Sequence, residues 1–102
     1  MKVNLTQLLH AMDGTPLVDR ETGKPITLGI VIENSALAQL PTDMALSPKE
    51  KFRLFKIALD VADKEEADLP AKDIELILRR IAMCQPTIVF GRCSQHLGEI
   101  PE

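Results

Sequence analysis

The side chains with the richest potential chemistry in this chain are two cysteines and two histidines. Cys93 and His96 stand three residues apart, with Cys84 nearby and His10 far along the sequence. Structural zinc sites usually take four such ligands in two close pairs, and only one close pair exists here. A Cys–His nucleophile and base would also need a third group to orient the base, and the sequence offers none. We therefore expect a buried thiol beside a surface imidazole, with no metal site and no cofactor.

A second chemical candidate is Gly23-Lys24, the dipeptide that ends a phosphate-binding loop. Pro25 follows where that loop needs Ser or Thr, and Val18 stands where it needs its upstream glycine. The dipeptide predicts a hairpin turn instead. No paired carboxylates and no Ser-His-Asp signature occur, because the nearby acidic residues are scattered. The sequence therefore predicts no catalytic residue and a protein that is not an enzyme, with a small enzyme kept as the third hypothesis.

Composition narrows the class of protein further. The 102 residues suit one domain, 1–102, and 45% of them are hydrophobic, which is enough for a core. The net charge is −3 and no Trp or Tyr occurs, so phosphate contacts and base stacking are both disfavoured. The sequence has no run of about 18 apolar residues that could span a membrane and no apolar h-region of a signal peptide. Its cysteines are too few for a secreted disulfide scaffold. We expect a cytoplasmic protein without a membrane partner.

The clearest element is an amphipathic helix over residues 47–63. Ser47 can cap it, Pro48 suits its first turn and Glu50 completes a capping box. At about 100° per residue, one narrow charged stripe contains Lys49, Arg53, Lys56, Asp60 and Asp63. The apolar residues cover roughly 220° of the circumference, well beyond the ~100° that a surface helix needs; they are Leu54, Phe55, Ile57, Ala58, Leu59, Val61 and Ala62. We expect this helix to be packed on more than one flank, by the rest of the domain or by a second chain.

The order of charges along 47–63 opposes the helix dipole. Lys49, Lys51, Arg53 and Lys56 lie toward the N-terminus, where the dipole prefers anions. A solvated face offset by Glu50 is the simpler interpretation, and a basic patch kept for an anionic partner is the alternative. The candidate partner-binding residues are Lys49, Phe52, Arg53, Phe55, Lys56 and Arg92.

The rest of the chain predicts short strands followed by helices. Residues 16–18 and Ile26, joined by a turn over 20–24, predict a hairpin, whereas residues 5–12 fit a helical turn or a strand. Residues 27–40 favour a helix capped by Thr27, with a strand as the alternative. Residues 41–46 are expected to be a loop and 64–68 an acidic connector. Helices are predicted from Pro70 to Cys84 and from about Thr87 to Leu97, with Gly98 as the C-cap.

The predicted fold class is therefore α+β: a short N-terminal β-hairpin packed against three to four α-helices, with 47–63 as the central one. The single domain divides into a hairpin region (1–26), a helical region (27–98) and a tail (99–102). Phe52 and Phe55 are expected to be core neighbours of the isoleucines in 74–81.

The helix pair at 70–97, split by Cys84-Gln85-Pro86, also fits a DNA-binding helix-turn-helix. Its second helix would present Thr87, Arg92, Ser94, Gln95 and His96 to a groove. Arg92 is the only basic residue among these, with Arg79 and Arg80 in the first helix. Base-reading residues normally lie among many phosphate-binding lysines and arginines, so nucleic acid is the less favoured partner.

Several short segments together resemble a group of small uncharacterised proteins of tailed bacteriophages and prophages. They are Asn4-Leu5, Asp13-Gly14, residues 23–29 (GKPITLG), 47–51 (SPKEK) and 86–92 (PTIVFGR). The resemblance implies a phage-derived protein in the bacterial host cytoplasm and brings no site residues with it. Combined with the wide apolar arc of 47–63, it predicts a non-enzymatic accessory protein, an assembly factor or a host-protein modulator. Such a protein would bind a phage or host protein or a second copy of itself; a DNA-binding transcriptional or packaging regulator is the alternative.

Overall fold

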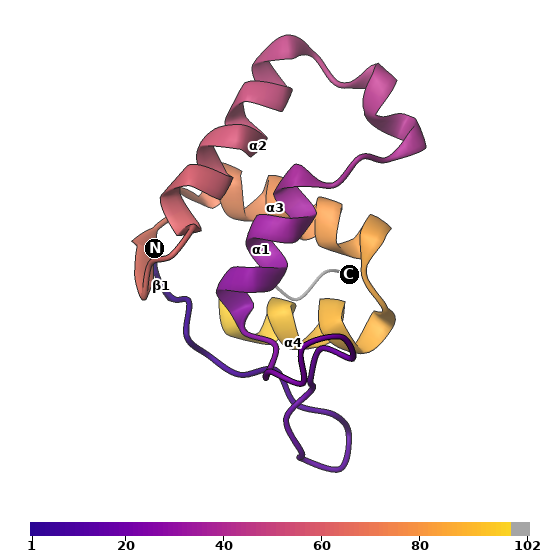
Figure 1. Cartoon of the computed structure of the whole chain (residues 1–102). Coiled ribbons are helices and arrows are strands. Elements are labelled where there is room, and N and C mark those ends of the chain that lie inside the picture. Colours follow the sequence, from indigo (N-terminus) through magenta and orange to yellow (C-terminus); the bar gives the residue numbers. More distant parts are fainter. Residues whose placement is uncertain (99–102) are drawn as a thin grey trace.

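The structure, a computed structural model, describes residues 1–98 apart from the side chain of Thr42. This part of the chain contains four α-helices, one 3-10 helix and one two-stranded antiparallel sheet, so the α+β class is confirmed (Figure 1). The elements are β1 (Lys2–Asn4), α1 (Leu28–Leu37), η1 (Pro41–Ala45), α2 (Pro48–Val61), β2 (Glu66–Asp68), α3 (Ala71–Cys84) and α4 (Thr87–Leu97). The predicted tail, 99–102, lies outside the described residues. None of the described helices is both long and apolar enough to cross a membrane.

The sheet joins two segments that are far apart in the sequence, and the prediction of an N-terminal hairpin is wrong. Strand β1 pairs with β2, with Val3 opposite Ala67, so the predicted acidic connector supplies a strand. Residues 16–26 form isolated bridges instead of strands: Val18 pairs with Pro25, and Pro16 pairs with His10. Since Pro16 and Pro25 have no backbone N–H, each end of that candidate hairpin lacks a donor for a regular ladder.

Local signals place the helices, and the helix favoured for 27–40 is present as Leu28–Leu37. The Thr27 hydroxyl accepts a hydrogen bond from the Ile30 N–H at 3.3 Å, and the Ser47 hydroxyl accepts one from the Glu50 N–H at 3.1 Å. Gly98 ends α4 with φ +71°, the left-handed conformation typical of a glycine cap. The expected loop at 41–46 contains the short helix η1.

Helix α1 lies against both α2 and α3, and α4 packs on α3 (Figure 1). The core is built around these contacts; its most deeply buried aliphatic side chains include Leu28, Ile32, Ile57, Ile74, Ile77 and Ile81. Hence α1 and α3, rather than 47–63, hold the central places in the helical packing. The side of α2 that packs against the molecule has the spacing i, i+3, i+4, i+7 and consists of Leu54, Ile57, Ala58 and Val61.

The expectation that Phe52 and Phe55 belong to the core is wrong. Both lie on the side of α2 opposite its buried residues and are exposed. The charged stripe also ends early: α2 stops at Val61, and Asp63 beyond it has φ +56°. The isoleucines of α3 are buried as expected, but by α1, α4 and the aliphatic side of α2 rather than by the two rings.

Candidate functional site

Three large hydrophobic side chains form a line on the outward side of α2. Phe52, Phe55 and Leu59 have exposed fractions of 64%, 50% and 55%. Their spacing of i, i+3 and i+7 places them along one side of the helix, and the two ring centroids are 6.4 Å apart. We call these three residues the outer α2 face. Single exposed hydrophobics are ordinary on a protein surface, whereas large contiguous apolar patches are typical of interaction sites.

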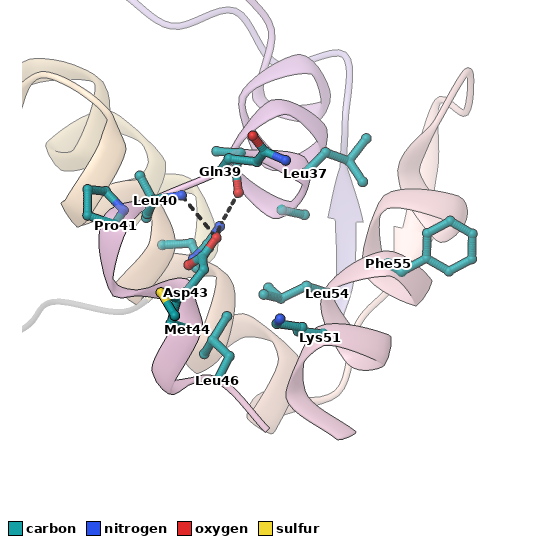
Figure 2. A pocket seen from close by; sticks show the side chains of 13 residues that line it. Leu37, Gln39, Leu40, Pro41, Asp43, Met44, Leu46, Lys51, Leu54 and Phe55 are labelled. Atoms are coloured by element: carbon teal, nitrogen blue, oxygen red, sulfur yellow. Dashed lines mark hydrogen bonds and ion pairs between the residues drawn. The ribbon is translucent and has the colours of Figure 1, made fainter. Parts of the chain in front are cut away.

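An open groove of about 570 Å³ lies beside this face, between the end of α1, η1 and α2. Phe55 belongs to both, because it also lines the groove. Leu54 and Lys51 extend from α2 toward η1, and the ring of Phe55 is turned to the outer side (Figure 2). The apolar lining includes Leu37, Leu40, Met44, Leu46, Leu54 and Phe55, and Leu37 and Met44 are themselves exposed. The groove therefore extends the apolar surface from α2 onto α1 and η1.

One buried arginine fixes the far wall of the groove. Arg80 of α3 donates to the carbonyl oxygens of Ser35, at 3.4 Å, and Ala38, at 2.5 Å. Its guanidinium also donates to both carboxylate oxygens of Asp43. Arg80 thus places a positive charge at the C-terminus of α1, where the helix dipole is negative, and ties η1 to α3.

Asp43 is held as a carboxylate by the same contacts. The hydrogen bond from Arg80, followed by one from the Leu40 N–H at 3.0 Å, lowers the pKa of Asp43 below its usual value. The pair is therefore close to neutral as a unit. Lys51 is the remaining charged residue of the groove lining.

Five of the six predicted partner-binding residues lie on α2, and four of these five are exposed. Lys49, Phe52, Phe55 and Lys56 are all exposed. Lys51 and Leu59 are also exposed on α2, although neither was among the site residues expected from the sequence.

The two predicted arginines make contacts within the molecule. Arg53 is half-buried and donates to Asp73 of α3 at 2.7 Å. Arg92 of α4 donates to the carbonyl oxygens of His10, at 2.9 Å, and Ala11, at 3.2 Å. Arg53 thus joins α2 to α3, and Arg92 holds the N-terminal segment against α4.

These contacts bear on the helix-turn-helix alternative. Of the arginines that it would use, Arg80 is buried and Arg92 is hydrogen-bonded to the N-terminal segment, which leaves Arg79 exposed. DNA binding through 70–97 stays a prediction, and the basic surface that this helix pair offers is small.

The surroundings of the Cys–His candidates do not activate the thiol. Cys93 is buried, and burial raises the pKa of its thiol to about 12. A thiol with that pKa is protonated and unreactive near neutral pH. Cys84 is half-buried, and both cysteines are free. Within residues 1–98, no three His, Cys, Asp or Glu side chains are grouped to hold a metal ion.

Comparisons with known proteins assign no family to this chain. Neither protein-family models, nor curated proteins, nor solved structures give a significant match. The functional conclusion therefore depends on the geometry of the outer α2 face and the groove beside it.

Proposed function

We propose that this chain is a non-enzymatic accessory protein of a bacteriophage or prophage that acts by binding another protein. The observation that carries the proposal is the exposure of Phe52, Phe55 and Leu59 on a helix whose opposite side is already packed. Nothing in the core requires large side chains at these positions. A partner that covers them supplies the reason for their size.

Burial of these side chains by a partner would contribute a favourable free energy of binding. Full burial of a Phe or Leu side chain is worth about 1.5–3 kcal/mol. Aromatic residues at the centre of an interface are also the usual binding hot spots. Two phenylalanines with a neighbouring leucine therefore fit the role of anchor residues in a small interface.

The phage context and the bacterial cytoplasm come from the resemblance of the short sequence segments. An assembly factor and a modulator of a host protein are the two roles that fit it. Both need a binding surface and neither needs a catalytic group.

Affinity capture with matched variants tests the proposal. The wild-type chain, a Phe52→Ser/Phe55→Ser variant and a Met12→Ser/Val18→Ser control are immobilised and exposed to lysate of the bacterial host, with and without phage infection. Met12 and Val18 are exposed hydrophobics away from α2, so the control removes equivalent apolar surface. We expect proteins retained by the wild type and the control but lost by the α2 variant. The same proteins on all three chains would contradict the proposal.

A further inference from the structure

Exposed lysines border the outer α2 face on both sides. At about 100° per residue, Lys51 lies on the groove side of the line, and Lys49 and Lys56 lie on the other side. The ion pairs formed within residues 1–98 join Met1 to Asp68, Arg53 to Asp73 and Arg80 to Asp43, so none of them uses these lysines. Three positive charges therefore surround the apolar line without an ionic partner.

The two carboxylates of α2 are less accessible than these lysines, and only Asp60 shares the charged stripe of Lys49 and Lys56. Glu50 and Asp60 are half-buried, and Glu50 accepts a hydrogen bond from the Ser47 hydroxyl. In the groove, Asp43 is paired directly with Arg80, and Lys51 attracts the same carboxylate only from beyond ion-pair distance. A chain with a net charge of −3 thus has a locally basic surface around its most exposed aromatic residues.

A second copy of this chain fits that surface poorly. Symmetric pairing through the outer α2 face would bring two sets of Lys49, Lys51 and Lys56 into one interface. Like charges across an interface are unfavourable, and exposed positions of α2 supply no carboxylate to separate them. Charge complementarity favours an acidic partner.

The shape of the site favours a helical segment. An amphipathic helix docks by placing side chains at i, i+3 or i+4, and i+7 in an apolar groove. The groove beside Phe55 has an apolar floor at Leu54, and its volume of about 570 Å³ admits large side chains. Acidic residues on both edges of the partner's apolar stripe would then meet Lys51 on one side and Lys49 and Lys56 on the other. A flat lipid surface would leave the groove unfilled.

We propose that the partner presents an acidic amphipathic helix, which buries its apolar stripe on Phe52, Phe55 and Leu59 and inserts one large side chain into the groove. The proposal rests on the proposed function, since it names the chemistry of the protein that this surface binds.

Three synthetic peptides with the same apolar stripe test it. Their polar positions are all Glu, all Gln or all Lys, and each is titrated into isotope-labelled protein by NMR. We expect the Glu peptide to bind roughly tenfold more tightly than the Lys peptide, with the Gln peptide between them, and to weaken as salt is added. Amide shifts should centre on α2 and η1.

Charge reversal on the protein supplies the matched control. A Lys49→Glu/Lys51→Glu/Lys56→Glu variant should reverse the order of the three peptides. A Lys2→Glu/Lys24→Glu/Lys72→Glu variant changes the net charge equally at exposed positions elsewhere and should keep the order. Circular dichroism melting establishes that both variants are folded.

The inference is overturned if the peptides bind equally or not at all, or if their shifts lie outside α2 and η1. It is also overturned if phosphatidylglycerol vesicles or a short DNA duplex compete for the same amides more strongly than the Glu peptide. These failures are distinct from that of the proposed function. If Phe52→Ser/Phe55→Ser still removes a captured protein while the triple α2 charge reversal retains it, protein binding stands and the acidic helix does not.

Discussion

Helices α2 and α3 have the same length, 14 residues, and use their apolar residues differently. Helix α3 lies between α1 and α4 and buries six residues: Ile74, Leu76, Ile77, Leu78, Arg80 and Ile81. Helix α2 packs mainly on α1, buries four residues and leaves both of its phenylalanines outside. A wide apolar arc therefore indicates contact on several flanks, but only α3 finds those contacts within its own chain. The unfilled part of the α2 arc is where we place the partner.

The largest expected effect on stability comes from an aspartate placed at a buried position of α3, compared with an aspartate at an exposed position of α2. Ile77→Asp places an unpaired carboxylate at a fully buried position of α3, which costs several kcal/mol against a total stability of about 5–15 kcal/mol. We expect this variant to be unfolded by circular dichroism. Phe55→Asp on α2 is its control and should melt cooperatively near the wild-type temperature. A folded, cooperatively melting Ile77→Asp variant would contradict the conclusion that α3 is buried more completely than α2.

Removing the buried arginine of α3 should have the next largest effect. Arg80→Met keeps much of the aliphatic stem but leaves the Ser35 and Ala38 carbonyls without their donor. We expect the free energy of unfolding to fall by about 2–3 kcal/mol in urea titrations. Arg79→Met, at the exposed neighbouring position, should change it by less than about 0.5 kcal/mol. Equal effects of the two substitutions would mean that Arg80 does not hold the groove wall.

The partner of that arginine predicts how stability depends on pH. Arg80 and the Leu40 N–H lower the pKa of Asp43 in the folded chain, so its contribution is fully present above the unfolded value of about 4. It is lost as the pH falls through the folded pKa. The melting temperature of Asp43→Asn should therefore lie below that of the wild type at pH 7, and the gap should narrow below about pH 4. A gap that is constant from pH 7 to pH 3 would show that the carboxylate charge is not what binds Arg80.

Sequence signals placed the four helices correctly because those signals are local. Each residue that marks a helix end acts within one or two turns of that end; these residues are Thr27, Ser47, the prolines before α3 and α4, and Gly98. The sheet was missed because its strands are separated by more than 60 residues, and three-residue strands carry almost no periodicity.

Four residues on or beside the outer α2 face, Lys49, Phe52, Phe55 and Lys56, were already candidates from the sequence, although both rings were also expected in the core. Periodicity alone defines an apolar arc without saying which part of it the rest of the chain covers. Arg80 was missed although its position carried a signal. On a helical wheel it lies between Leu76 and Ile77, inside the arc that α3 buries.

The smallest expected effect on stability is that of substituting the outer α2 face, and it tests most directly whether this face is distinct from the core. Phe52→Ser/Phe55→Ser removes two exposed rings, so we expect the free energy of unfolding to change by no more than about 0.5 kcal/mol per site in urea titrations. Phe90→Ser is the matched control. Phe90 lies half-buried against the core, and its loss should cost about 2 kcal/mol. If the double α2 variant is as unstable as Phe90→Ser, the rings are packed against their own chain in solution, and the size of Phe52 and Phe55 needs no partner to explain it.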